Sequence, residues 1–283
     1  MTATDATSRD EDQRVLVRQV QDLRAEGDAL NDLLTGMDDD YWHQATAFKN
    51  WSVWEVVAHL HFSDYLALTS LRSAAEFKPL AQQVTSARSP GAFTRQWLMQ
   101  GRQQPLTGPE LRQRWRSMFI EMCEQLAAAD PNERFAWFGP GMKARMFTTA
   151  RQMETWAHGW EIYDLMGVQR KHSDRLRHIA TIGVRTYGWT FTNRKLPVPE
   201  PAPYVRLQAP SGAVWDFNDP DAGHCVEGDA VEFCQVVTQV RNIADTSLAV
   251  TGNNARAWMD IAQCFAGPPE DPPAPGSRVA ALA

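Results

Sequence analysis

Apolar side chains recur three and four residues apart over most of the first 167 residues, and this spacing predicts helices with one buried face. The first helix is expected over residues 11–36, the second over about 51–76 and the third over 108–129. A fourth, around residues 151–166, carries tryptophan and methionine on several sides, which indicates a buried helix. Four such helices predict an antiparallel bundle.

Two of the helix starts are marked by capping boxes, in which a Ser or Thr and a Glu three residues later satisfy each other's backbone N–H groups. Ser52 with Glu55 marks the second helix, and Thr107 with Glu110 marks the third. Between these two helices, the Pro and Gly positions over residues 79–105 predict a loop that contains one short helix.

Beyond residue 167 the pattern changes from helical spacing to alternation. A fifth helix is expected over residues 172–194, and the prolines of 196–203 then favour an extended linker. Apolar and polar side chains alternate over the short stretches that follow, as is typical of strands separated by turns. The strands are expected at 204–208, 213–217, 226–228 and 247–251, and further helices at 230–240 and 254–265.

The chain is therefore expected to be of the α+β class, with a four-helix bundle followed by a small α+β domain. The predicted boundaries are a flexible N-terminus at 1–10, the bundle at 11–167, a connecting helix and linker at 168–202, the small domain at 203–266 and a disordered tail at 267–283. Disorder is expected in the tail because its prolines remove N–H donors and fix the backbone.

Charge and composition narrow the class of partner. The 283 residues carry a formal net charge of −6 at pH 7, which argues against nucleic acid or an anionic membrane as the partner, because both need a basic surface. No apolar run is long enough to span a membrane, and the N-terminus is polar and acidic, so we expect a cytoplasmic protein. The four cysteines form no CxxC pair, so reduced thiols are expected.

The residues that can carry chemistry lie on the predicted fourth helix. Glu154 and His158 are four residues apart and project from one face, where a carboxylate and an imidazole make half of a metal site. Arg151 lies one turn before Glu154, and Glu161 lies nearly one turn after His158. We expect Arg151 to neutralise carboxylates and Glu161 to hold an imidazole. Taken alone, Glu154 and His158 have two alternatives to a metal site. Such residues also occur as a pair on a helix surface, or with the histidine in the core and its hydrogen bonds satisfied.

A third ligand is available on the second helix, which carries both His59 and His61. Two residues along a helix correspond to about 200° of rotation, so the two imidazoles point largely away from each other. His59 lies close to the apolar face that carries Val56 and Phe62, so we predict His59 as the ligand. His61 is the alternative.

These motifs resemble a known family. The resemblance rests on two segments, Trp51-Ser-Val with His59-Leu60, and Arg151-x-x-Glu154-x-x-x-His158-x-x-Glu161. They are similar to the DinB-like metal-binding domain of mycothiol-dependent maleylpyruvate isomerases and their actinobacterial relatives. The resemblance implies that His59, Glu154 and His158 coordinate zinc, with Arg151 and Glu161 behind them. The family usually has Asp at the position of Glu161, which leaves room for a different geometry.

The order of elements in the small domain also resembles the C-terminal domain of that family, which has a sterol-carrier-protein-like topology. In the isomerases an arginine at a helix end faces the metal site from this second domain. The resemblance places this catalytic arginine at Arg241, where a guanidinium could clamp a substrate carboxylate. An arginine at a helix end is otherwise ordinary, because it complements the helix dipole.

The resemblance implies a metal enzyme that uses a low-molecular-weight thiol as cosubstrate. Relatives use mycothiol, glutathione or bacillithiol, and the expected reaction is isomerisation of a small unsaturated acid or transfer of the thiol to it. Two other hypotheses are a non-catalytic, metal-dependent module that binds a small molecule and a hydrolase that activates metal-bound water. The sequence leaves open the substrate, the thiol, the metal and whether the protein is a monomer or a homodimer.

Overall fold

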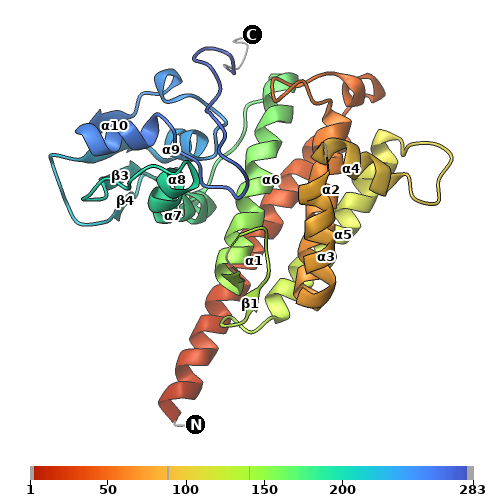
Figure 1. Ribbon diagram of the computed structural model, residues 1–283, viewed down its shortest axis with the longest axis horizontal. Coiled ribbons are helices and arrows are strands. Elements are labelled where there is room, and N and C mark those ends of the chain that lie inside the picture. Colours follow the sequence, from red (N-terminus) through yellow and green to blue (C-terminus); the bar gives the residue numbers. More distant parts are fainter. Residues whose placement is uncertain (1–2, 88, 140, 279–283) are drawn as a thin grey trace. The chain divides into compact units, whose positions relative to one another are not determined.

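The predicted helices of the first part of the chain are followed by a small sheet with helices packed on it (Figure 1). The computed structural model describes residues 3–87, 89–139 and 141–278. Contacts divide the chain into a first unit, Met1–Gly159, and a second unit, Trp160–Ala283. This architecture confirms the predicted α+β class, with a helical N-terminal part and a sheet-containing C-terminal part. The predicted domain boundaries stay predictions.

Four helices form the bundle of the first unit. They are α1 (Ala3–Thr35), α2 (Val53–Arg72), α5 (Gly108–Ala128) and the first part of α6 (Ala144–Met166). Helix α5 packs against both α1 and α2. Buried apolar side chains of the bundle include Leu16, Leu23, Leu60, Leu111, Trp115, Phe119 and Trp156. Helix α1 begins inside the stretch 1–10 that we expected to be flexible, and residues 1–2 lie outside the described ones.

Both predicted capping boxes are confirmed. Ser52 Oγ accepts a hydrogen bond from the backbone N–H of Glu55 at 3.3 Å, and the Glu55 carboxylate accepts one from the backbone N–H of Ser52 at 2.9 Å. Thr107 and Glu110 form the same reciprocal pair at the start of α5. Because α2 begins immediately after Ser52, this cap sets the register that places His59 two turns into the helix.

The connection between α2 and α5 is more helical than the sequence indicated. It contains α3 (Ala74–Ser86) and α4 (Pro90–Leu98), so the predicted loop is wrong over its first part. Ser73 ends α2 and its side chain caps α3, and the buried ring of Phe77 packs against Phe62 and Leu66. That burial outweighs the backbone hydrogen bond lost at the proline inside α3.

The second unit is built on a four-stranded sheet of order β4-β3-β5-β6. Strands β3 and β5 are parallel, and the other neighbouring pairs are antiparallel. The strands are β3 (Tyr204–Gln208), β4 (Val214–Phe217), β5 (Cys225–Asp229) and β6 (Ala249–Thr251). All four confirm predicted strands. A further hairpin of β1 (Arg134–Phe135) and β2 (Met142–Lys143) belongs to the first unit.

Short helices complete the second unit, and α9 packs against α7 and the sheet. They are α7 (Arg177–Arg185), α8 (Tyr187–Asn193), α9 (Ala230–Val237) and α10 (Asn253–Met259), with 3-10 turns at Asp174–Leu176 and Ile243–Asp245. A 3-10 turn at Asp39–His43 precedes α2 in the first unit. The single helix predicted over 172–194 is wrong, because the chain bends at Thr186, whose hydroxyl donates to the carbonyl of Ile182 at 2.7 Å.

The proline-rich segment 267–278 is held against the second unit by specific hydrogen bonds, in contrast to the disorder that we predicted. Gln239 donates to the carbonyl of Glu270, and Asn242 donates to the carbonyl of Pro273, each at 2.8 Å. Prolines lack N–H groups but keep their carbonyls, so side chains of the unit can still anchor such a segment. The remainder of the predicted tail, 279–283, lies outside the described residues.

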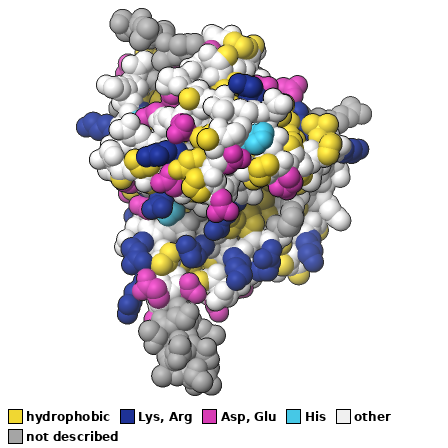
Figure 2. Space-filling view, turned by 90° about the vertical axis from the view of Figure 1, so that its left-hand side faces the viewer, with side chains coloured by type: hydrophobic (Ala, Val, Ile, Leu, Met, Phe, Trp, Pro, Cys, Tyr) yellow, Lys and Arg dark blue, Asp and Glu magenta, His cyan; other side chains and the backbone are white. Residues whose placement is uncertain are grey.

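Charged side chains of both signs lie close together on the face shown in Figure 2. Among the helices of the described part of the chain, none is both long and apolar enough to cross a bilayer.

Candidate metal centre

Three side chains from two helices of the bundle meet in the first unit: His59 of α2, and Glu154 and His158 of α6. The Nε2 atom of His59 lies 3.7 Å from Oε2 of Glu154, and Nε2 of His158 lies 3.5 Å from the same oxygen. All three residues offer a ligand atom within 4.8 Å of the others. The structure thus brings together the three residues that we predicted as ligands.

The two histidines of α2 lie in different surroundings. His59 faces the ring of His158, with 4.6 Å between the ring centroids. His61 is 4% exposed and lies against Trp97, with 5.2 Å between their rings. The rotation expected for two residues on a helix therefore separates them, as the sequence indicated. Their burial is the reverse of our expectation, because His61 is the more buried of the two and the side chain of His59 is 29% exposed.

The distances in the cluster suit a small divalent metal. Zinc takes imidazole nitrogen and carboxylate oxygen at about 2.0–2.2 Å, so tetrahedral geometry places ligand atoms about 3.3 Å apart. The observed separations of 3.5 and 3.7 Å need only small side-chain rotations to reach that value. Within the described residues the cluster offers three ligands, which leaves a tetrahedral metal one position for another group.

The protonation states also suit metal binding. Burial alone would raise the pKa of Glu154, but the adjacent imidazoles of His158 and His59 and the charge of Arg151 hold it well below its usual range. Burial lowers the pKa of His158, and the positive charges near it, from His59 and Arg151, lower it further. The Glu154 carboxylate raises this pKa but does not outweigh them. At pH 7 the carboxylate is ionised and this imidazole is neutral, which are the forms that bind a metal.

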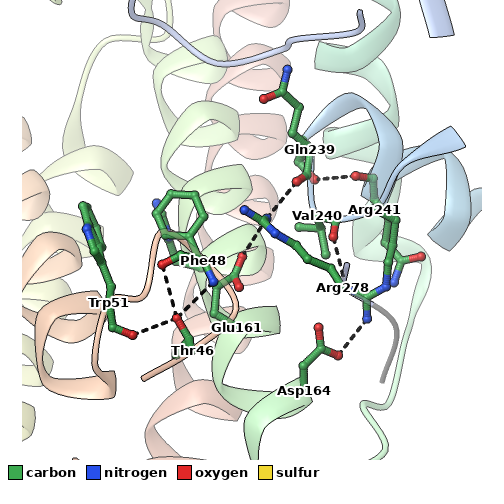
Figure 3. A network of polar contacts seen from close by, with 12 residues as sticks. Thr46, Phe48, Trp51, Glu161, Asp164, Gln239, Val240, Arg241 and Arg278 are labelled. Atoms are coloured by element: carbon green, nitrogen blue, oxygen red, sulfur yellow. Dashed lines mark hydrogen bonds and ion pairs between the residues drawn. The ribbon is translucent and has the colours of Figure 1, made fainter. Parts of the chain in front are cut away.

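Aromatic side chains enclose the two imidazoles. The ring of Trp51 lies parallel to His158 at 6.3 Å and 5.4 Å from His59, and Phe48 meets His158 edge-on at 5.1 Å. Phe48 and Trp51 lie in the loop before α2, and Thr46 closes this loop, because its hydroxyl donates to the carbonyl of Trp51 at 2.8 Å (Figure 3). Phe48 could not be predicted as a site residue, because a loop residue follows no periodic pattern.

Arg151 has a buried partner that the sequence analysis missed. Its Nη2 and Nε donate to one oxygen of Asp64 at 2.8 and 3.2 Å, and the indole of Trp115 donates to the other oxygen at 3.1 Å. Both charged side chains are almost fully buried, at 2% exposure for Arg151 and 0% for Asp64. The pair joins α2 to α6, the two helices that carry the metal cluster. The sequence feature that could have revealed this pair is Asp64 itself, an acidic residue among the apolar residues of α2.

Glu161 forms an ion pair with Arg278, whereas we expected Glu161 to hold an imidazole. Arg278 Nη1 lies 3.3 Å from the Glu161 carboxylate and donates to the carbonyl of Gln239 at 3.0 Å (Figure 3). Burial raises the pKa of Glu161 to about 7, helped by the charge of Asp164 and opposed by those of Arg278 and Arg241.

Arg241 is held firmly within the second unit. Its Nη2 donates to Asp164 at 2.7 Å, its Nη1 donates to the carbonyl of Val240 at 3.1 Å, and its guanidinium lies 5.3 Å from the ring centre of Trp160. The side chain is 9% exposed. Sequence reasoning did not name Asp164 as its partner. A role of Arg241 in catalysis stays a prediction.

The raised pKa of Glu161 predicts a pH-dependent stability. The folded state binds a proton at Glu161 more tightly than the unfolded state does. Protonated Glu161 therefore adds to the free energy of unfolding in full below pH 4.5, and this added stability is lost as the pH rises from 4.5 to about 7. Relative to Glu161→Gln, the wild type should lose about 3 kcal/mol of unfolding free energy over this range. Urea titrations at both pH values measure it. Glu227→Gln, at an exposed position, is the control. The prediction would be contradicted if the unfolding free energies of wild type and Glu161→Gln changed equally with pH.

Comparison with known proteins places this geometry in a family. The family model of the mycothiol maleylpyruvate isomerase N-terminal domain matches residues 23–163. An uncharacterized protein from two strains of Mycobacterium tuberculosis is 37% identical over 250 residues, which is 88% of this chain and 96% of that protein.

Two solved structures share the fold. A crystal structure of the mycothiol-dependent maleylpyruvate isomerase has a TM-score of 0.51 at 12% identity, and a histidine-to-alanine mutant of it has a TM-score of 0.50 at 14%. Each match covers 78% of this chain and 88% of the other. At this identity the likeness concerns the fold alone. The matched domain model and the extended similarity to the mycobacterial protein show that the chain belongs to the mycothiol maleylpyruvate isomerase N-terminal domain family.

Proposed function

We propose that this chain is a divalent-metal enzyme that uses a low-molecular-weight thiol, with mycothiol as the leading candidate, on a small unsaturated acid. The single observation that carries the proposal is the cluster of His59, Glu154 and His158 in a chain of this family. Two imidazoles and one carboxylate are a typical ligand set for zinc in a tetrahedral site with one open position, so zinc is the metal that we propose. Isomerisation and transfer of the thiol to the acid are the two reactions considered.

A zinc ion bound by this cluster would act as a Lewis acid and hold a thiol in its thiolate form at neutral pH. The protein's own contribution is to fix the ligands. Glu154 stays ionised, and the rings of Trp51 and Phe48 restrict how the imidazole of His158 can turn. The Asp64–Arg151 pair sets the spacing of the two helices from which the ligands project.

The nucleophilic thiol has to come from outside the chain. All four cysteines are buried. Burial raises the pKa of Cys123 to about 12 and that of Cys225 to about 11, and it raises the pKa of Cys234 well above its usual range. These thiols are protonated at pH 7 and are poor nucleophiles. A small thiol fits the requirement, because its addition to an activated double bond allows rotation before elimination returns it.

Arg241 is the residue that we propose for binding the substrate carboxylate. Its contacts with Asp164 and the Val240 carbonyl use two of the five N–H donors of a guanidinium, and the others stay available for a carboxylate. The ion pair with Asp164 also fixes the plane of the guanidinium, so little side-chain entropy is left to lose on binding.

The proposal is tested by metal-dependent binding of the thiol. Zinc-loaded protein at 100 times the Kd of mycothiol should gain about 2.7 kcal/mol of stability, because the ligand binds only the folded state. Thermal unfolding with and without zinc measures this gain. S-methylated mycothiol is the matched control, since it lacks the ionisable thiol. No protection by mycothiol in the presence of zinc would contradict the proposal.

Activity assays separate the remaining alternatives. Loss of maleylpyruvate absorbance that requires both zinc and mycothiol would identify an isomerase or transferase, and product analysis distinguishes the two. Ester hydrolysis that needs zinc but no thiol would favour the hydrolase. Protection by mycothiol without turnover of any unsaturated acid would favour a binding module.

A further inference from the structure

The first unit contains a cleft apart from the metal cluster, on the side of α2 that carries His61. It is a cleft of about 740 Å³ bounded by α2, α4, the loop after α4 and α5. Its lining residues include His61, Trp97, Arg102, Leu106, Arg114 and Met118. None of the three residues of the metal cluster lines it.

His61 is a buried polar group in the wall of this cleft. Its side chain is 4% exposed, and Nδ1 has no hydrogen-bond partner among the described residues. Buried polar groups are normally satisfied by a hydrogen bond. A ligand in the cleft would supply a partner.

Two arginines give the cleft its charge. Among the described residues neither Arg102 nor Arg114 makes a side-chain hydrogen bond or ion pair. The hydrogen bonds with Thr107 lower the pKa of Glu110 most, and the charges of these two arginines add to that effect. The two acids of the lining are engaged elsewhere. Glu110 caps α5 through Thr107, and Glu121 pairs with an arginine at the end of α2. The donors of the two guanidinium groups are therefore available to an anion.

The remaining wall favours a flat apolar body. The indole of Trp97 lines the cleft and lies 5.2 Å from the ring of His61, while its contacts with Phe62 and Tyr65, at 5.0 and 4.8 Å, hold it in place. The part of the indole that borders the cleft gives a planar group an aromatic surface to pack on. Leu106 and Met118 add apolar surface. Small-molecule sites commonly combine such walls with a few polar groups that fix orientation.

We infer that this cleft binds a small aromatic carboxylate, with its ring against Trp97 and its carboxylate toward Arg102 and Arg114. His61 would bond to a polar substituent or to a water that the ligand orders. This site is separate from the metal centre, and the inference does not depend on the proposed reaction.

The test follows the indole N–H signals of ¹⁵N-labelled protein during titration with benzoate. The Trp97 signal is assigned by its loss in Trp97→Phe, and the Trp51 signal, assigned in the same way, reports binding at the metal centre. We expect saturable movement of the Trp97 signal by benzoate and at least fivefold weaker binding of benzamide, which has the same ring without the charge.

Substitution in the cleft sharpens the test. Arg114→Gln should weaken benzoate binding about fivefold to tenfold, as expected for loss of one charged hydrogen bond. Arg112→Gln removes the same charge two residues away, from a side chain that contacts Asn31 and Thr35 instead, and should leave the Kd unchanged. Equal weakening by both variants, equal binding of benzamide, or movement of the Trp51 signal alone would overturn the inference.

Discussion

The substitution His59→Ala is expected to lower zinc affinity by more than about 100-fold, because changes in residues that merely support metal ligands already cost 10–100-fold. The remaining Glu154 and His158 sit on one helix and cannot surround a metal alone. His61→Ala is a matched control, since it removes an imidazole from the same helix but from another environment. Loss of thiol-dependent activity should accompany loss of zinc.

Elemental analysis after dialysis against chelator-free buffer measures the expected difference. Wild type and His61→Ala should retain about one equivalent of metal, and His59→Ala should retain almost none. Thermal unfolding of the metal-free proteins shows whether each variant is folded. Retention of metal by folded His59→Ala, or its loss from folded His61→Ala, would show that the cluster has been assigned wrongly.

The substitution Asp64→Asn is expected to cost about 3–5 kcal/mol of unfolding free energy, because it leaves the Arg151 guanidinium buried without a counter-ion. The new amide has one acceptor oxygen, so if that oxygen accepts from Trp115 the amide NH2 faces the Arg151 donors, and the cost combines the lost charge with the lost hydrogen bonds from Arg151. Urea denaturation at pH 7 followed by circular dichroism measures it.

A second variant separates the charge from the packing. Asp64→Asn combined with Arg151→Met removes both charges, and it should recover more than half of the stability that Asp64→Asn loses. Zinc affinity should fall in Asp64→Asn, because the ion pair holds α2 against α6. A double variant no more stable than the single one would mean that the buried charge is not the cause.

The sequence supplied the features that depend on local periodicity. Helix positions and the two capping boxes follow from residues within a few positions of one another, as does the opposite orientation of His59 and His61 on α2. The strands of the second unit could be predicted for the same reason, because the alternation of apolar and polar side chains can be seen within five residues. Family resemblance added the pairing of His59 with Glu154 and His158.

Features that depend on contacts between distant segments were missed. Asp64 could be recognised as unusual in an apolar helix, but nothing local identified Arg151 as its partner. The helix α3 was missed because a proline argues against it, and the packing of Phe77 that stabilises it is a tertiary contact. Arg278 was assigned to a disordered tail on composition, which does not reveal that Glu161 is its partner.

The pair of Arg278 and Glu161 has a consequence for the order in which the chain assembles during synthesis. The residues of the metal cluster have all been made once residue 158 has left the ribosome, and N-terminal units generally fold first. Glu161 is made almost immediately afterwards, but its counter-ion Arg278 is made 117 residues later. Until then the ionised carboxylate lacks this partner and is better hydrated than buried. The second unit therefore completes its packing after the metal-binding residues are already available.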